Sequence, residues 1–159
     1  MDRLWSPWRY QYVSQAPEKS ACIFCEHAAA TQDEENYVLH RARYNFVVLN
    51  LYPYTNGHLM IAPYQHVPDL VETPAETLAE MMKLAQAAEA ALRAEYQPEG
   101  INVGFNLGRC AGAGVAGHLH LHMLPRWCGD TSFMTAIGET RVLPEDLRAT
   151  YQKLRRHFS

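Results

Sequence analysis

Short apolar runs separated by turn-forming residues dominate the first half of the chain. Runs rich in β-branched and aromatic residues predict strands at 37–39, 46–50, 58–63 and 101–106. Polar turn segments join the first three runs, at 41–45 and 53–57, and Pro63 ends the third run. Such short connections predict an antiparallel meander, because neighbouring strands joined by tight turns run in opposite directions.

Between the third and fourth runs the apolar spacing changes to that of a helix. Thr73 is expected to cap this helix, Pro74 suits its first turn, Glu76 stands at the capping-box position, and Pro98 to Gly100 end it. Its buried face is expected to consist of Leu78, Met81, Met82, Ala85, Ala88, Ala91 and Leu92.

A second helix is predicted near the C-terminus. It is expected to begin at Pro144 and to turn Leu147, Tyr151 and Leu154 inward. Strands and helices in this order predict an α+β fold, in which an antiparallel sheet carries the helices on one face.

The segment from His118 to Met123 alternates histidine with apolar residues. At strand spacing the three imidazoles lie on one face, while Leu119, Leu121 and Met123 lie on the other face and pack. The glycine-rich loop 108–117 leads into this segment and can direct backbone N–H groups at a phosphate. The pattern permits a histidine nucleophile that attacks phosphorus, an open catalytic metal site, or three hydrogen-bonded histidines without chemistry.

Composition and net charge limit the domain number, the partners and the cellular location that we expect. A chain of 159 residues with 48% hydrophobic content suits a single domain spanning 1–159. The net charge of −3 comes from mixed signs, so neither nucleic acid nor a membrane surface is expected as a partner. Without a signal-peptide core or a membrane-length apolar run, cytoplasm is the expected location, where the four cysteines would be reduced or metal-bound.

These motifs together resemble the histidine triad (HIT) family. The resemblance rests on the run from His118 to Leu124, on 22–25, 50–58 and 61–63 with His66, and on Asn106 before the glycine loop. Segments 4–9, 111–114 and 125–134 are similar to the bacterial diadenosine tetraphosphate phosphorylase branch of that family. The resemblance implies a HIT-like sheet carrying a long helix and a C-terminal helix.

The activity that the resemblance implies is nucleotidyl transfer through an adenylyl-histidine. Inorganic phosphate would then release ADP, after ATP has left the tetraphosphate. Two other enzymes remain as alternatives, a dinucleoside polyphosphate hydrolase and a nucleoside phosphoramidate hydrolase. An alternative of another class is a non-catalytic nucleotide-binding protein.

The family pattern also implies roles for individual residues. His120 would be the nucleophile, with His122 and His58 as catalytic partners at the phosphate. Nucleotide contacts would come from Phe24, Asn50, Leu51, Asn106, Gly112, Gly114 and Val115. Asn50 replaces the aspartate that usually binds ribose, and Gly114 replaces a serine often found in the phosphate loop.

Zinc-binding members of the family imply a metal site at Cys22, Cys25, His66 and His118. Two thiolates and two imidazoles make a closed tetrahedral set, which suits a structural zinc ion. Taken alone, the Cys-x-x-Cys motif would equally suit a redox pair or two buried thiols.

Further expectations concern partners and flanking segments. Adenine nucleotides or dinucleoside polyphosphates and inorganic phosphate are the implied ligands, and the family implies a homodimer or a homotetramer. Residues 1–20 would form an aromatic N-terminal arm and 135–159 a C-terminal helical extension. His27, like His40 and His157, is expected at the surface or in a capping role.

Overall fold

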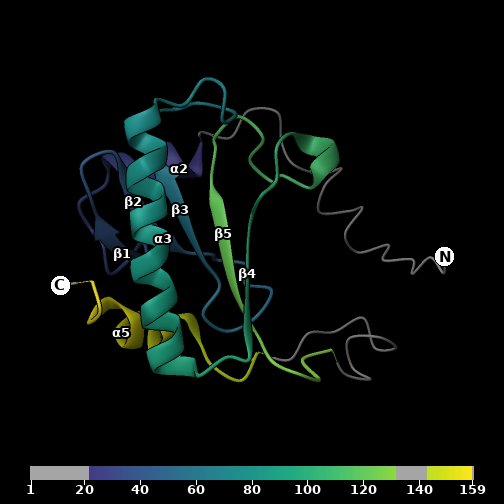
Figure 1. Ribbon diagram of the computed structural model, residues 1–159. Helices are drawn as coiled ribbons and strands as arrows, with labels where there is room; N and C mark the ends of the chain where they lie inside the picture. The colour runs from purple at the N-terminus through teal and green to yellow at the C-terminus, as the bar shows by residue number, and fades with distance from the viewer. Residues whose placement is uncertain (1–21, 132–142, 159) are drawn as a thin grey trace, which may run out of the picture.

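The computed structural model describes residues 22–131 and 143–158 (Figure 1). The expected N-terminal arm at 1–20 and the first part of the expected extension at 135–159 lie outside this range. A five-stranded antiparallel sheet has the order β1-β2-β3-β5-β4. Its strands are β1 (Val38–Arg41), β2 (Asn45–Leu49), β3 (Leu59–Pro63), β4 (Gly100–Phe105) and β5 (Leu121–Arg126). The first three strands form the predicted meander.

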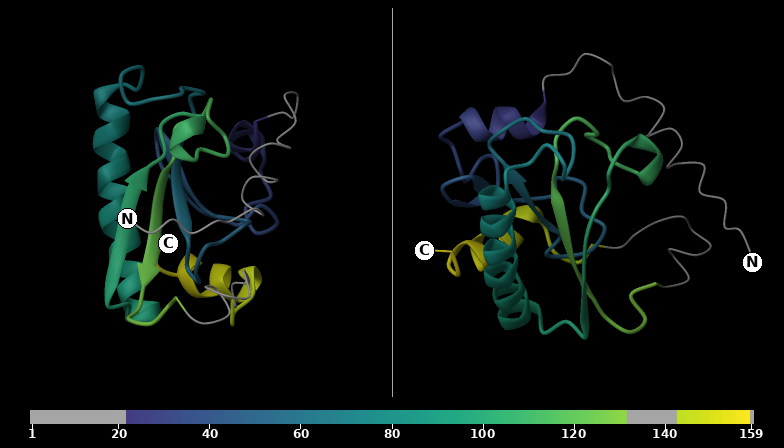
Figure 2. Two further views of the ribbon diagram at one scale, coloured as in Figure 1. Left: turned by 90° about the vertical axis from the view of Figure 1, so that its right-hand side faces the viewer. Right: turned by 45° about the horizontal axis from the view of Figure 1, so that its top comes forward.

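Helices cover both faces of the sheet. The long helix α3 (Ala75–Tyr96) and the C-terminal helix α5 (Leu147–Arg155) belong to the main core, as predicted. The short helix α2 (Ile23–Ala29) inserts Phe24 into a second cluster with Val38, Phe46, Val48 and Ala62. Figure 2 shows α2 and α3 on opposite sides of the strands. The expectation of helices on one face is therefore wrong for α2, which the sequence pattern did not predict.

Several details of the predicted helices differ in the structure. The Thr73 hydroxyl donates to the Asp69 carbonyl at 2.6 Å, and no side chain caps the first turn of α3. Met82 was expected in the core but is 53% exposed, whereas Met81 is buried. The helix α5 starts at Leu147 instead of Pro144, because the Asp146 side chain accepts the Ala149 N–H as an N-cap.

The strand that carries the histidines begins at a later residue than predicted. β5 begins at Leu121, and the preceding residues are fixed by a hydrogen bond from the Leu119 N–H to the Val67 carbonyl at 2.6 Å. The alternation nevertheless persists through this extended approach. Leu119, Leu121 and Met123 lie in the main core, and the histidines face the side that α2 covers.

The C-terminal end of α2 is held by Arg41 of β1. Its guanidinium donates to the carbonyls of His27 and Ala30, each at 2.8 Å, and to that of Ala28 at 3.2 Å. The same side chain pairs with Asp33. A helix of seven residues has little stability of its own, so these bonds help fix its position over the sheet.

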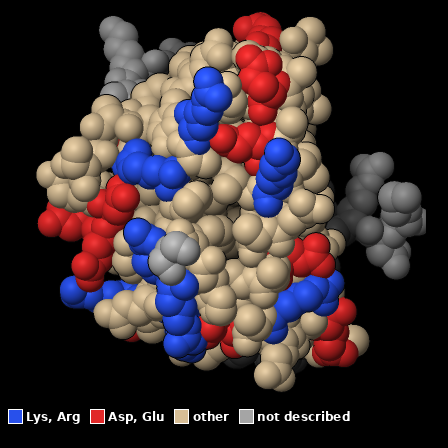
Figure 3. Space-filling model, turned by 60° about the vertical axis from the view of Figure 1, so that its left-hand side comes forward, with Lys and Arg blue, Asp and Glu red and all other residues tan. Residues whose placement is uncertain are grey.

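The described surface carries charges of both signs. Figure 3 shows basic and acidic side chains interspersed over one face of the molecule. Ion pairs such as Arg93–Glu89 and Arg156–Glu95 belong to this mixture. No described helix has the length and apolar character required to cross a membrane.

Candidate functional site

A cavity of about 200 Å³ lies where α2, the end of β2, the glycine loop and the histidines meet. Its wall includes eight of the predicted site residues: Phe24, Asn50, Leu51, Gly112, Gly114, Val115, His120 and His122. Ile23, Val48 and Met60 add further apolar surface. A mainly apolar cavity with a few convergent polar groups is the usual form of a small-molecule site.

Two predicted site residues are placed differently. Asn106 directly follows β4 and does not line this cavity. His58 lies beneath the cavity wall, 1% exposed, and contacts it through His122. Tyr54, which the sequence analysis did not single out, lines the cavity and stacks on the His122 ring at 6.4 Å between centroids.

The hydrogen bonding of His120 determines which ring nitrogen is free. Its Nδ1 lies 2.7 Å from the His118 carbonyl oxygen, which can only accept, so Nδ1 carries the proton. Burial lowers the pKa of His120, and the Phe24 ring covers one side at 4.7 Å between centroids. The neutral ring therefore keeps a lone pair on Nε2, as a nucleophile requires.

His58 sets the tautomer of His122 in the same way. The Tyr54 backbone N–H donates to His58 Nδ1 at 3.2 Å, so the proton of His58 lies on Nε2. That Nε2–H donates to His122 Nδ1 at 2.9 Å and leaves His122 with an Nε2–H. Burial, assisted by the neighbouring His120, lowers the pKa of His122 to about 4. His122 is thus a neutral hydrogen-bond donor beside the neutral ring of His120.

Asn50 supports this arrangement from the end of β2. Its Oδ1 accepts the Tyr52 N–H at 2.9 Å, and its Nδ2 lies 3.3 Å from His58 Nδ1. The asparagine therefore joins the 50–58 loop to the buried His58 while lining the cavity.

His27 is the functional candidate that the sequence analysis missed. It was expected at the surface or in a capping role, but it lies on α2 with only 8% of its surface exposed and forms part of the cavity wall. The expectation is wrong because α2 was not predicted: on this helix His27 follows Phe24 by one turn and faces the same way. Burial lowers its pKa, so the ring is neutral.

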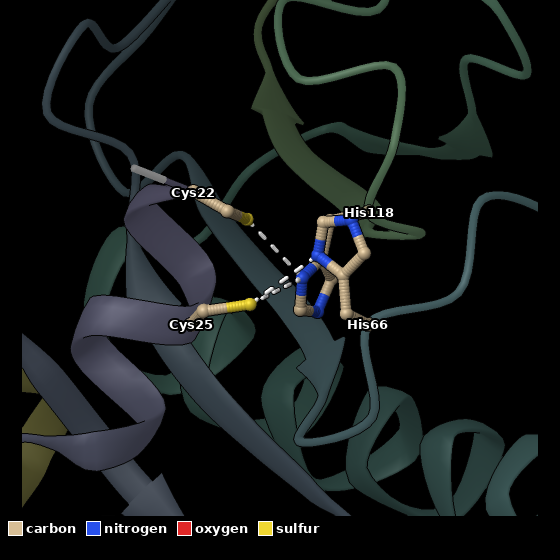
Figure 4. Close-up of side chains that lie close together, drawn as sticks. All are labelled: Cys22, Cys25, His66 and His118. Atoms are coloured by element: carbon tan, nitrogen blue, oxygen red, sulfur yellow. Dashed lines mark hydrogen bonds between the residues drawn. The ribbon is translucent and has the colours of Figure 1, made fainter. Parts of the chain in front are cut away.

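The four predicted metal ligands come together beside the cavity (Figure 4). All four ligand atoms lie within 4.8 Å of one another. His118 Nδ1 is 3.3 Å from Cys22 Sγ and 3.6 Å from Cys25 Sγ, and His66 Nδ1 is 3.3 Å from Cys25 Sγ.

These distances fit a tetrahedral ion. Zinc bonds of about 2.3 Å to sulfur and about 2.0 Å to nitrogen place two such ligands about 3.5 Å apart. His118 also has the required tautomer, because its Nε2–H donates to the Pro63 carbonyl at 2.8 Å and leaves the Nδ1 lone pair toward the cysteines. The residues therefore fit a closed, structural metal site.

Comparison with known proteins identifies the family. The model of the HIT domain matches residues 31–128. The chain belongs to the HIT family. An AP-4-A phosphorylase of Mycobacterium tuberculosis is 41% identical over 162 residues, which cover 97% of this chain and 83% of that protein. Together the HIT match and this relative support a nucleotide-processing enzyme.

Solved HIT structures confirm the fold. A Zn-bound histidine triad protein from Mycobacterium smegmatis is 30% identical with a TM-score of 0.69, over 86% of this chain and 92% of that one. A hypothetical histidine triad nucleotide-binding protein from Sulfolobus tokodaii is 26% identical with a TM-score of 0.68, over 86% and 91%. The predicted α+β, HIT-like architecture is confirmed.

Proposed function

We propose that this HIT protein cleaves diadenosine tetraphosphate by phosphorolysis, giving ATP and ADP through an adenylyl group on His120. The observation that carries the proposal is the fixed tautomer of His120, whose Nδ1–H is held by the His118 carbonyl at 2.7 Å while the ring lines the cavity. The M. tuberculosis relative, by its name an AP-4-A phosphorylase, supports the choice of substrate.

In the first step, His120 Nε2 attacks the phosphorus next to one adenosine. A nitrogen–phosphorus bond forms, the bond from that phosphorus to the bridging oxygen breaks, and ATP leaves with the electron pair. The imidazole becomes an adenylylated cation that retains its Nδ1–H. The His118 carbonyl, already accepting that proton, stabilises the positive charge.

In the second step, an oxygen of inorganic phosphate attacks the same phosphorus. The nitrogen–phosphorus bond breaks, its electron pair returns to Nε2, and ADP is released while the phosphate proton passes to solvent. In this proposal the His122 Nε2–H donates to a phosphoryl oxygen in both steps, and the hydrogen bond from His58, which keeps the proton on that nitrogen, supports this role.

The remaining cavity residues bind the nucleotide. Gly112, Gly114 and Val115 bring loop backbone to the cavity wall, where N–H groups can contact phosphate oxygens. Phe24 and Leu51 supply apolar surface for the base, and Asn50 offers its amide to the ribose. Zinc held by Cys22, Cys25, His66 and His118 would act structurally, by joining α2 to the strand ends.

The test uses isotopically labelled inorganic phosphate with diadenosine tetraphosphate. The proposed route places the label in ADP alone, because ATP leaves before phosphate enters. Label in ATP would mean that phosphate attacks an inner phosphorus and would contradict an adenylyl-enzyme. AMP formed at the same rate without phosphate would contradict phosphorolysis and identify a hydrolase.

A His120→Ala variant separates the enzyme from a binding protein. We expect turnover to fall by at least about a thousandfold when the nucleophile is removed. Rapid quenching at neutral pH followed by mass spectrometry should detect an adenylyl group on His120 in the wild type only. Absence of both turnover and adduct in the wild type, with nucleotide still raising the melting temperature, would establish the non-catalytic alternative.

A further inference from the structure

The cavity is too small to enclose a whole dinucleoside tetraphosphate. Its volume is about 200 Å³. Pockets that enclose a drug-sized ligand measure roughly 300–1,000 Å³, and diadenosine tetraphosphate is larger than such a ligand. With one adenosine beside Phe24 and its phosphate at His120, the other phosphates and the second adenosine have to extend out of the cavity.

The exposed residues of the wall show where the cavity opens. Tyr52 and Tyr54 of the 50–58 loop and Gly114 of the glycine loop are exposed, while the other described residues of the wall are buried or half-buried. These two loops therefore form the edges of the opening. A second adenosine that extends out of the cavity passes between them and meets two tyrosines on one edge.

The two tyrosines differ in what their rings contact. Tyr54 lies against the histidines, with its ring centroid 4.8 Å from that of His58 and 6.4 Å from that of His122. Tyr52 is 69% exposed, whereas Tyr54 is 38% exposed. Tyr52 therefore presents the larger aromatic surface to a ligand outside the cavity.

The backbone at Tyr52 is held in place from both sides. Its N–H donates to Asn50 Oδ1 at 2.9 Å, and the following Pro53 restricts residue 52 to extended conformations. A tyrosine side chain has only two torsion angles to fix, so a ring on such a backbone loses little conformational entropy when a ligand binds. Tyr52 is thus suited to stack on a flat ring.

Ion pairs contribute little to binding at this opening. Among the described residues of the cavity wall there is no Lys or Arg and no Asp or Glu. The wall therefore neither attracts nor repels the phosphate chain through charged side chains of these kinds. Affinity for the substrate has to come from hydrogen bonds and from apolar contact, and the stacking of a base on an aromatic side chain supplies the second of these.

We propose that Tyr52 is the stacking platform for the second adenine of diadenosine tetraphosphate and makes this protein prefer dinucleoside polyphosphates to nucleotides with a single base. The inference rests on the proposed function and adds the residue that recognises the far end of the substrate. Because every base has a flat face that can stack, the platform selects for the presence of a second base and tolerates differences in its identity.

The test compares two ligands that cannot be cleaved at the adenosine-bearing phosphorus. Both carry methylene groups in place of the bridging oxygens next to the adenosine-bearing phosphates. One is α,β-methylene adenosine tetraphosphate, with a single adenosine, and the other is the bis-methylene analogue of diadenosine tetraphosphate. Calorimetry gives the Kd of each ligand for the wild type and for the variants. The ratio of the two Kd values isolates the second adenosine, because the charge difference between the ligands is the same for every protein.

In Tyr52→Ala we expect the two-adenosine ligand to bind about fivefold or more weakly, whereas the affinity of the one-adenosine ligand should change by less than about twofold. Tyr52→Phe should bind both ligands as the wild type does, because the ring stacks and the hydroxyl is not required. Phe24→Leu is the matched control: it should weaken both ligands to a similar extent and leave the Kd ratio unchanged.

Melting curves by circular dichroism establish that each variant is folded. If Tyr52→Ala does not fold, Tyr52→Leu takes its place, since leucine keeps apolar bulk but has no flat ring. It should lower the affinity for the two-adenosine ligand in the same way.

An equal loss of affinity for both ligands in Tyr52→Ala would place Tyr52 at the first nucleoside and overturn the inference, as would an unchanged affinity for both. The binding assay needs no turnover, so its outcome is independent of the reaction. A chain that fails to cleave diadenosine tetraphosphate, but whose Tyr52→Ala variant loses affinity for the two-adenosine ligand alone, would contradict the proposed function alone. Cleavage together with an unchanged Kd ratio in Tyr52→Ala would contradict this inference alone.

Discussion

At the scale of single residues, the site depends on which nitrogen of each imidazole holds the proton. Backbone carbonyls fix His118 and His120, and the Tyr54 N–H fixes His58 and through it His122. Three histidines that are equivalent in the sequence thereby differ in the structure: His118 presents an unprotonated Nδ1, His120 an unprotonated Nε2 and His122 an Nε2–H. Each assignment follows from one hydrogen bond, because a carbonyl can only accept and a backbone N–H can only donate.

Replacement of His58 should act on catalysis through His122. In His58→Leu, His122 Nδ1 loses its donor and its Nε2–H is no longer enforced, so we expect kcat to fall roughly tenfold to a hundredfold with a smaller change in KM. Long-range proton–nitrogen correlation spectra should show Nε2–H at His122 in the wild type and a mixture of tautomers in the variant. An unaltered tautomer with normal kcat would show that His58 has no such role.

The low pKa of His122 predicts acid destabilisation. The unfolded chain takes up a proton near pH 6.5, whereas the folded chain takes it up only near pH 4. The contribution of His122 to the free energy of unfolding is therefore fully present above pH 6.5. It is lost as the pH falls from 6.5 to about 4, by at most ~1.4 kcal/mol per pH unit. Urea unfolding at several pH values gives the change of the free energy of unfolding with pH. This change should be smaller in His122→Asn than in the wild type, because asparagine does not titrate.

At the scale of elements, α2 connects the candidate metal site to the cavity. Cys22 and Cys25 stand at its first turn, Phe24 and His27 face the cavity, and Arg41 holds its final carbonyls. A short helix fixed at both ends keeps its cavity face in register with the histidines. If the two cysteines lost their metal ion, the start of α2 would be released. We expect this to disturb the part of the cavity wall that α2 forms more than the hydrogen bonds of the histidines.

Metal removal should consequently weaken nucleotide binding. We expect a chelator, or Cys22→Ser, to lower the melting temperature by several degrees and to raise the dissociation constant of AMP. Elemental analysis should find about one zinc ion per chain in the wild type. Absence of stoichiometric metal would contradict the structural role of zinc. So would a melting temperature and an AMP affinity that the chelator leaves unchanged.

The sequence predicted the elements that are long or have a regular spacing of apolar residues. The meander, α3 and the alternating histidines carry long or regular patterns, and the structure has all of them. The pattern gave no signal for α2, because a seven-residue helix is stabilised by tertiary contacts such as those of Arg41. Because α2 was not predicted, the burial of His27 was not predicted either. β5 starts late because its pairing with β3 and β4 begins only at Leu121, and no local pattern reveals where pairing between strands begins.

At the scale of the whole molecule, the sheet is covered unevenly. α3 packs over β2, β3 and β5 and leaves the edge strand β4 partly uncovered. Val103 pairs with the buried Met123 across the sheet and so lies on the α3 face, yet it remains 49% exposed. Within the described residues the outer backbone groups of β4 have no strand partner. An apolar edge of this kind invites pairing with another chain.

We therefore expect two copies of this HIT chain to associate through β4. Sedimentation equilibrium should give a dimer for the wild type, and Val103→Asp should shift it toward monomer, since burial of a carboxylate opposes association. Val71→Asp is the matched control, because Val71 is 94% exposed in the loop before α3 and its replacement should leave the dimer intact. A wild type that is monomeric at micromolar concentration, or a Val103→Asp variant that stays dimeric, would place the interface elsewhere or exclude it.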